Sequence, residues 1–340
     1  MLTDLALLVF SLVLILISAE IFTNGIEALG KRLALSQAVV GSILAAIGTA
    51  MPETILPFVA ILLYGGDAGA NIGVGAILGA PFMLSTLAFF LVGITVLFAY
   101  SRGKRAFEFR VDAAVIRRDL TFFIFMYGAA IFIPLIWSGS KFILAGLLVI
   151  AYFVYVWLTV TCVSRGMARV EELYFGRLIR FFRRRGKDES PVLIVLIAMQ
   201  VICSLAIMVG GAHLFVEGLE KLSSSWGISP LLFALLAAPV ATELPEKFNS
   251  VTWTLKGKDA LAAGNITGAM VFQSAFPVSL GLVFTDWTFS GTALLSAVMA
   301  LAAAIIILAA LLIRKRLSPV TMMSTGFIYL TYVVVIILKQ

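Results

Sequence analysis

The chain has 340 residues, of which 61% are hydrophobic and only 13% are charged. Soluble domains average roughly 45–50% apolar and about 25% charged residues, so this composition excludes a soluble globular protein. The mean hydropathy is +1.09, and nearly every segment of the chain is hydrophobic. This pattern predicts an all-α integral membrane protein that crosses the bilayer many times. The net charge of +7 is explained by basic loops, and no nucleic-acid partner is expected.

Few residues are available for cofactor chemistry or enzyme catalysis. The two cysteines, Cys162 and Cys203, have neither disulfide nor metal-ligand spacing, and His213 is the only histidine. P-loop, GxSxG and HExxH motifs are absent. The first apolar run carries Asp4 and has no cleavage site, so it is expected to be retained as a span. We therefore expect no cofactor and no enzymatic activity.

Ten apolar stretches are long enough to cross a bilayer, which takes about 20 residues each. In chain order they cover residues 4–30, 36–63, 69–99, 119–138, 142–163, 191–222, 228–255, 260–284, 289–313 and 320–338.

The loops between these stretches are alternately basic. Of the 25 Lys and Arg residues, 21 follow odd-numbered spans, and an excess of positive charge marks cytoplasmic loops. Both termini are therefore predicted to lie outside. A compact chain without a large loop between its halves favours a prokaryotic plasma membrane. The most basic loop contains Arg183, Arg184 and Arg185, which could contact anionic lipid, although a solvated topology signal explains the same charges.

The chain contains an internal duplication. An offset of 193 residues aligns nine identical pairs between residues 22–53 and 215–246, including Thr49 with Thr242 and Glu53 with Glu246. Each copy holds five spans, an odd number, so the second copy enters the membrane from the opposite face. We predict a first repeat over residues 1–163, a basic cytoplasmic linker over 164–190 and a second, inverted repeat over 191–340. Inverted repeats recur among secondary transporters, which bind substrate near the midplane.

A buried acid lies beside a proline in the middle of spans 2 and 7. The segments are Gly48-Thr49-Ala50-Met51-Pro52-Glu53 and Ala241-Thr242-Glu243-Leu244-Pro245-Glu246. Proline frees backbone carbonyls around residues 45–48 and 238–241, and an ionised carboxylate at this depth is costly unless paired or solvated. Two carboxylates, two threonine hydroxyls and freed carbonyls suit a hard divalent cation such as Ca²⁺. Alternatively, the prolines only kink packed helices and the acids bond to neighbouring hydroxyls.

These segments resemble the cation/calcium exchanger superfamily, whose two repeats carry Gly-Thr-Ser-x-Pro-Glu on helices 2 and 7 and Gly-Asn-x-x-Gly-Ser-Asn on helices 3 and 8. The resemblance covers essentially the whole chain and implies ten helices with an ion site between helices 2, 3, 7 and 8. It implies exchange of Ca²⁺ for Na⁺, or for H⁺ in some branches. By position, the resemblance implies that Thr49, Glu53, Thr242 and Glu246 are core ligands and that Asn265 belongs to the helix 8 motif.

The chain departs from that pattern at several ligand positions. Alanine replaces the expected serine on three of the four helices, and Glu243 replaces it on helix 7. The acid or amide expected one turn further on is Leu84 on helix 3 and Gln273 on helix 8. With several oxygen ligands missing, a full set of Na⁺ sites around one Ca²⁺ site is not implied. The alanines are Ala50, Ala80 and Ala269.

Helix 7 also carries Lys247, the only basic residue in the middle of a span. Glu243 and Lys247 are four residues apart, with the acid first, which lets the two side chains meet on one helical face. We expect Lys247 to neutralise Glu243 and to occupy the position of a monovalent cation, leaving Glu53 and Glu246 as the pair that holds the transported ion. In the alternative, Lys247 points away and snorkels towards the cytoplasm.

The sequence thus predicts a secondary-active cation antiporter, with Na⁺/Ca²⁺ exchange by alternating access as the first reading. The alternatives are H⁺-coupled exchange of Ca²⁺ or another divalent cation, and a family member that senses cations without transporting them. An intramembrane hydrolase using Glu53 and Glu246 as a carboxylate pair is opposed by the inverted repeat and by the lack of a nucleophile.

Overall fold

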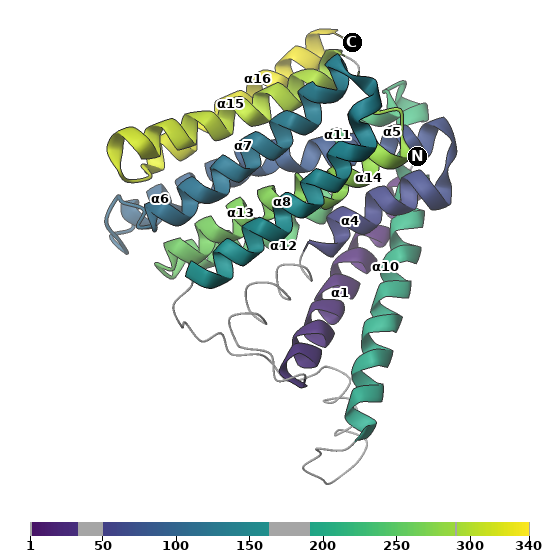
Figure 1. The fold of residues 1–340 in the computed structure, drawn as a ribbon, viewed down its shortest axis with the longest axis horizontal. Coiled ribbons are helices and arrows are strands. Elements are labelled where there is room, and N and C mark those ends of the chain that lie inside the picture. The colour runs from purple at the N-terminus through teal and green to yellow at the C-terminus, as the bar shows by residue number, and fades with distance from the viewer. Residues whose placement is uncertain (1, 33–49, 163–190, 290, 340) are drawn as a thin grey trace.

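The computed structural model describes residues 2–32, 50–162, 191–289 and 291–339, and the regular structure in these ranges is helical (Figure 1). The first half contains α1 (Leu2–Arg32), α4 (Met51–Phe58), the π-helix η2 (Val59–Tyr64), α5 (Gly66–Met83), the π-helix η3 (Leu84–Ala88), α6 (Phe89–Ser101), α7 (Ala113–Ile136), the short 3-10 helix η4 (Ser138–Ser140) and α8 (Lys141–Cys162). The second half contains α10 (Pro191–Trp226), α11 (Pro230–Thr242), α12 (Leu244–Leu255), α13 (Asp259–Gln273), α14 (Phe276–Phe284), α15 (Gly291–Arg314) and α16 (Pro319–Lys339).

The helices fit the predicted spans. Within the described residues, eight helical segments are long and apolar enough to cross a bilayer, and two shorter apolar helices, Met51–Tyr64 and Pro230–Val240, overlap predicted spans 2 and 7. The repeat boundaries stay predictions. Thr49, the linker 164–190 and Arg183 to Arg185 lie outside the described residues.

The fourth span begins earlier than predicted. The hydropathy pattern placed its start at residue 119, but α7 begins at Ala113. Asp112 caps this helix, because its carboxylate accepts a hydrogen bond of 2.9 Å from the backbone N–H of Ala114. Arg117 and Arg118, which were assigned to the preceding loop, therefore lie within the first two turns of the helix.

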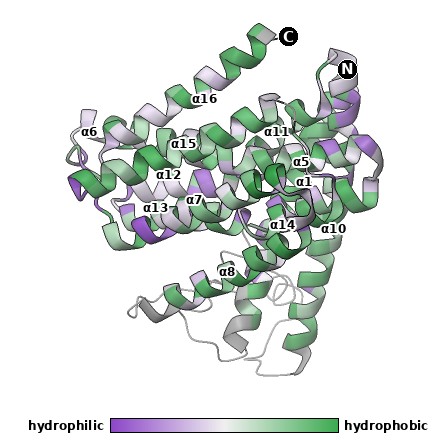
Figure 2. Cartoon of the chain, turned by 45° about the horizontal axis from the view of Figure 1, so that its top comes forward, coloured by the Kyte–Doolittle hydropathy of each residue, from purple (hydrophilic) through white to green (hydrophobic). Residues whose placement is uncertain are grey.

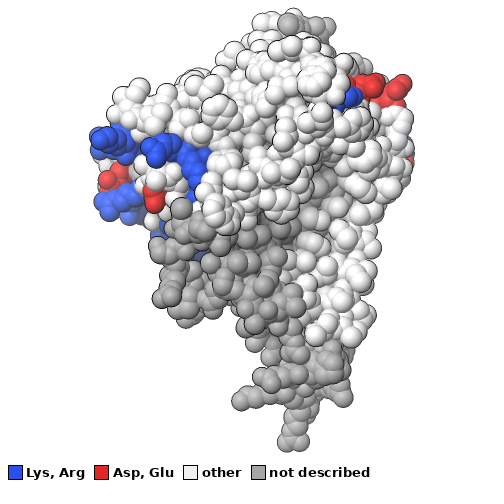
Figure 3. Space-filling model, viewed as in Figure 1, with Lys and Arg blue, Asp and Glu red and all other residues white. Residues whose placement is uncertain are grey.

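Hydrophobic residues predominate along most of the helices (Figure 2), and many of the large ones are exposed on the outer surface. Phe125, Ile136 and Ile313 are 73%, 88% and 82% exposed, a distribution that is stable only in contact with lipid. On the face seen in Figure 3, the Lys and Arg side chains gather at the end that holds the α6–α7 connection, and acidic side chains gather near the opposite end. The chain is an integral membrane protein.

Helices α1 and α10, one from each half, pack side by side and extend away from the remaining helices (Figure 1). Gly211 of α10 lies against Ile15 of α1, where an added Cβ would be 3.2 Å from the isoleucine side chain. The buried Gln200 amide donates to the Ile21 carbonyl at 2.9 Å and to the Asn24 side-chain oxygen at 3.0 Å. Small residues and buried amides hold membrane helices together in this way, so α1 and α10 form a two-helix unit.

Helices α5 and α11 make a much closer contact at the centre of the molecule. A Cβ on Gly75 would lie 2.3 Å from the Leu231 carbonyl oxygen, and a Cβ on Gly79 would lie 2.1 Å from the Leu235 carbonyl oxygen. Only hydrogen fits at these two positions, so the two backbones touch. This contact packs α5, from the first half of the chain, directly against α11, from the second half.

Replacing Gly79 with Ala should separate α5 from α11, because the added methyl group would overlap the Leu235 carbonyl and the Pro239 ring. Overpacking of this kind costs about 1–3 kcal/mol, and unfolding in mixed micelles should show the loss. The Gly128→Ala control on α7 has no atom within 4 Å of the new Cβ and should be neutral or slightly stabilising. Equal stability of the two variants would contradict the close contact.

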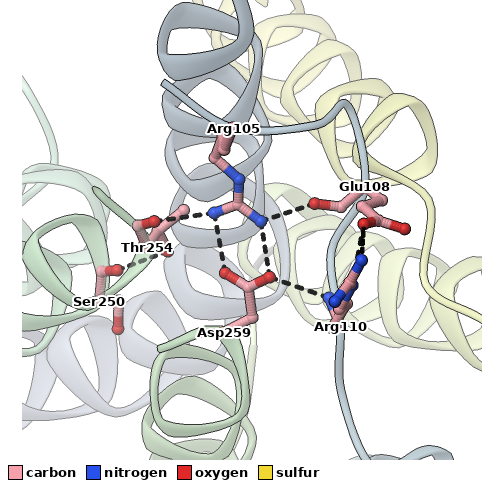
Figure 4. Close-up of polar contacts among 6 residues, drawn as sticks. All are labelled: Arg105, Glu108, Arg110, Ser250, Thr254 and Asp259. Atoms are coloured by element: carbon pink, nitrogen blue, oxygen red, sulfur yellow. Dashed lines mark hydrogen bonds and ion pairs between the residues drawn. The ribbon is translucent and has the colours of Figure 1, made fainter. Parts of the chain in front are cut away.

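An arginine connects the loop after α6 to the turn between α12 and α13 (Figure 4). The Arg105 guanidinium donates to both carboxylate oxygens of Asp259, at 2.9 and 2.6 Å. It also donates to the carbonyls of Thr254 and Glu108, at 2.8 and 2.6 Å, and Asp259 accepts the Arg110 backbone N–H at 2.9 Å. The side chain of Asp259 is only 3% exposed. Arg105 therefore connects the first half of the chain to the end of α12 and the start of α13.

Replacing Arg105 with Ala should destabilise the fold by about 3 kcal/mol, since breaking a buried ion pair leaves an uncompensated charge. Equilibrium unfolding in mixed micelles would measure this loss. In the Arg110→Ala control, the backbone N–H to Asp259 remains, and the 81% exposed side chain should contribute less than about 1 kcal/mol. If both variants unfolded alike, the Arg105 bridge would not be a stabilising contact.

Candidate cation site

Span 7 is broken at Glu243, as the sequence predicted. Helix α11 ends at Thr242 and α12 begins at Leu244, with Glu243 between them at φ −94° and ψ 8°. Pro245 is the second residue of α12, and it has no N–H to offer to the preceding turn. The break is short, because the Glu243 N–H still bonds to the Pro239 carbonyl at 3.1 Å.

The first half has the same local backbone at the equivalent position. Ala50 precedes α4 with φ −86° and ψ 6°, and it aligns with Glu243 at the offset of 193 residues. As a result, Glu53 and Glu246 are each the third residue of their helices. The N-terminal turn of a helix carries a partial positive charge, which favours a carboxylate there.

Three acidic side chains are buried where these helices begin. Glu53, Glu246 and Glu243 are 4%, 2% and 0% exposed. Neither carboxylate oxygen of Glu53 accepts a hydrogen bond from the part of the chain that the structure describes. Glu53 interacts electrostatically with Glu246, Glu243 and Lys247, which places the four charges in one region. Buried carboxylates in a membrane require cations, so this region is suited to bind them.

Thr242 and Asn265 complete the second half of the site. The Thr242 hydroxyl donates to the Ala238 carbonyl at 3.2 Å, which leaves lone pairs on its oxygen for a cation. The Asn265 amide donates to the Glu246 carbonyl at 3.0 Å and to the Ser250 hydroxyl at 3.1 Å. Asn265 thus holds the backbone of Glu246 in place from α13. Ser250 was not singled out from the sequence.

Glu243 has partners on both carboxylate oxygens. The Gln273 amide lies 3.3 Å from Oε1, and the Lys247 ammonium lies 3.3 Å from Oε2. Lys247 is only 7% exposed, so it does not reach towards the cytoplasm as the alternative required. The contact predicted from the spacing of Glu243 and Lys247 is present.

Asp119 is a buried acid that the sequence pattern did not assign to any role. It is 1% exposed, accepts a 2.7 Å hydrogen bond from the Thr267 hydroxyl and lies 3.1 Å from the Arg118 guanidinium. Thr267 belongs to α13, so Asp119 anchors the helix that carries Asn265 and Gln273. The only sequence feature that could have indicated this role is the position of Asp119, directly after Arg117 and Arg118 at the start of an apolar run.

The ligands available to a cation are oxygen atoms. In residues 2–32, 50–162, 191–289 and 291–339, no three Asp, Glu, His or Cys side chains lie close enough to hold a metal ion by themselves. Two carboxylates, the Thr242 hydroxyl and carbonyls near the helix break remain, and such mixed sets of oxygens suit Ca²⁺.

An all-helical membrane fold in which α4 and α12 begin at equivalent positions of the duplication, each with a buried acid in its first turn, is typical of an ion-exchanger type of membrane protein. The sequence pattern of the sodium/calcium exchanger protein family matches residues 3–161 and 196–338, and the chain belongs to this family. Inner membrane protein YrbG of Escherichia coli (strain K12) is 24% identical over 299 residues, which cover 84% of this chain and 81% of that protein.

Solved structures share the fold. The H⁺/Ca²⁺ exchanger CAX superposes with a TM-score of 0.74 at 16% identity, covering 97% of this chain and 82% of the other. The sodium-calcium exchanger NCX_Mj superposes with a TM-score of 0.58 at 16% identity, covering 97% of both chains. At this identity the likeness shows the fold, and it agrees with the fold class predicted from the sequence.

Replacing Asn265 with Ala should weaken cation binding without unfolding the protein, because Glu246 loses a backbone hydrogen bond from α13. A hydrogen bond of this kind contributes about 1 kcal/mol, which corresponds to roughly a fivefold loss of affinity. The shift of thermal unfolding with added Ca²⁺ would report it. An unchanged Ca²⁺ response would show that Asn265 does not position Glu246.

Proposed function

We propose that this chain is a secondary-active antiporter that exchanges Ca²⁺ for Na⁺ by alternating access. The observation that carries the proposal is the matched pair of buried acids, Glu53 and Glu246, at the first turns of α4 and α12. The ion is held between α4, α5, α11 with α12, and α13. Inorganic cations are its substrates, and an ion gradient supplies the energy.

The chemistry follows from competition for the same oxygens. Glu53 and Glu246 attract a cation and replace part of its water shell, while the Thr242 hydroxyl and the Ala241 carbonyl, to which Pro245 has no N–H to donate, complete it. Ca²⁺ and the coupling ion need the same carboxylates, so one must leave before the other binds. Family membership and the fold shared with two calcium exchangers support this mechanism.

The two-helix unit of α1 and α10 supplies the movement in this proposal. It packs on the rest of the chain separately from the close α5–α11 contact. Sliding of this unit over a fixed site opens the ion to one side of the membrane and then to the other. The gathering of basic side chains at the α6–α7 end supports an orientation with that end in the cytoplasm, both termini outside, and a prokaryotic plasma membrane as the location.

Proton coupling is the second candidate, and one observation favours it. Ala50, Ala80 and Ala269 have no oxygen in their side chains, whereas Na⁺ needs several oxygen ligands. A proton needs only the carboxylate that it neutralises. The same two acids, Glu53 and Glu246, then alternate between Ca²⁺ and H⁺.

Replacing Glu53 or Glu246 with Gln tests the proposal. Radioactive Ca²⁺ uptake is measured in proteoliposomes loaded with Na⁺ and in vesicles that carry only a pH gradient. Each variant loses a charged ligand worth about 1.5–3 kcal/mol, so uptake should fall by about 10-fold to 100-fold. The Glu217→Gln control changes an acid on α10 that is paired with Lys221 away from the site and should transport normally.

The outcomes separate the candidates. Uptake that requires internal Na⁺ supports Na⁺ coupling, and uptake that follows only the pH gradient supports H⁺ coupling. Wild-type protein that moves Ca²⁺ under neither gradient would contradict Ca²⁺ exchange and favour another cation or a cation-sensing role.

A further inference from the structure

Lys247 places an ammonium group inside the candidate site. Its ammonium lies 3.3 Å from Glu243 Oε2, 3.2 Å from the Pro239 carbonyl oxygen and 2.6 Å from the Met83 sulfur. Glu243 lies between α11 and α12, Pro239 belongs to α11, and Met83 is the last residue of α5. The side chain bends back over the helix break and does not extend along α12.

Two partners of this ammonium, a carboxylate oxygen and a carbonyl next to a helix break, are those expected of a bound hard cation. The third partner, the Met83 thioether at the end of α5, is not a ligand that such a cation prefers. Gln273 orients the same carboxylate through Oε1, and Glu243 is 0% exposed. A free cation at this point would meet the same oxygens, so Lys247 occupies a position that an ion would otherwise fill.

The charges of the region can be added. Glu53, Glu243 and Glu246 contribute three negative charges when ionised, and Lys247 contributes one positive charge. These are the groups that act electrostatically on Glu53. Asp119 is paired with Arg118 and Thr267. With all three carboxylates ionised, the four groups therefore sum to a charge of −2.

We propose that Lys247 sets the stoichiometry of exchange, so that one divalent cation is exchanged for two monovalent cations with no net charge moved. The proposal rests on the function proposed for Glu53 and Glu246. A charge of −2 is neutralised by one Ca²⁺ or by two monovalent ions. A neutral loaded site crosses the low-dielectric interior at least electrostatic cost, so these two loaded states are the ones that reorient.

The pair of Glu243 and Lys247 permits a matched set of variants. Lys247→Met keeps an unbranched side chain and leaves the site at −3, which one Ca²⁺ does not neutralise but three monovalent cations do. The Ca²⁺-loaded site of this variant keeps one negative charge and reorients more slowly, and each exchange cycle that is completed moves one net charge. The double variant Glu243→Gln, Lys247→Met removes both members of the pair and returns the site to −2.

The test measures Ca²⁺ accumulation in proteoliposomes under a K⁺ diffusion potential set with valinomycin, with the coupling-ion gradient held constant. One net charge per cycle changes the equilibrium Ca²⁺ ratio by about 50-fold per roughly 100 mV. We expect this dependence for Lys247→Met and no dependence for the wild type and the double variant. Wild-type exchange that responds to the potential, or a Lys247→Met variant that ignores it, would overturn the proposal.

A second measurement tests the role of Lys247 even if the protein does not exchange Ca²⁺. If the wild type exchanges no Ca²⁺, the function proposed for Glu53 and Glu246 is wrong, and thermal unfolding of the variants then tests only whether Lys247 replaces a cation. Na⁺, compared with a bulky organic cation, should stabilise Lys247→Met by a few degrees more than it stabilises the wild type or the double variant. Equal responses of all three proteins would show that the ammonium does not replace a cation.

Discussion

The structure depends on the cost of keeping ionised carboxylates in the interior of a membrane. Glu53, Glu243 and Glu246 are all at most 4% exposed, and lipid offers no water to solvate them. Two responses to this cost are visible. Glu53 and Glu246 each lie in the first turn of a helix, where the partial positive charge of the helix N-terminus favours a carboxylate. A lysine is placed against Glu243. The remaining negative charge is what a cation is required to neutralise.

Much of this arrangement could be predicted from the sequence, because lipid restricts the chain to helices and hydropathy shows where they lie. The duplication indicated which acids are equivalent in the two halves, since Thr49, Pro52 and Glu53 recur as Thr242, Pro245 and Glu246. The i, i+4 spacing predicted the contact between Glu243 and Lys247, because the geometry of a single helix determines it.

Contacts between distant segments could not be predicted in the same way. Asp119 and Thr267 are 148 residues apart, and Lys247 and Met83 are 164 residues apart. No local pattern links such residues, because the packing of different helices brings them together. The start of α7 was missed for a different reason. Arg117 and Arg118 lower the local hydropathy, although a capped helix accommodates them at a membrane surface.

At the start of α4 and of α12, the two halves have similar backbone conformations but different side chains. Ala50 and Glu243 have nearly the same φ and ψ angles, yet only the second carries a charge. The acid added at this point is accompanied by a base four residues later, which has no counterpart in the first half, where residue 54 is Thr. The site is therefore asymmetric within a symmetric framework.

The bridge from Arg105 to Asp259 bears on how the protein is made. Arg105 is synthesised 154 residues before the carboxylate that it binds, so the loop after α6 lacks its partner while the next spans are inserted. During that time the guanidinium has access to water at the membrane surface. Its burial is a late step of assembly, which joins the two halves only after the turn before α13 has left the ribosome.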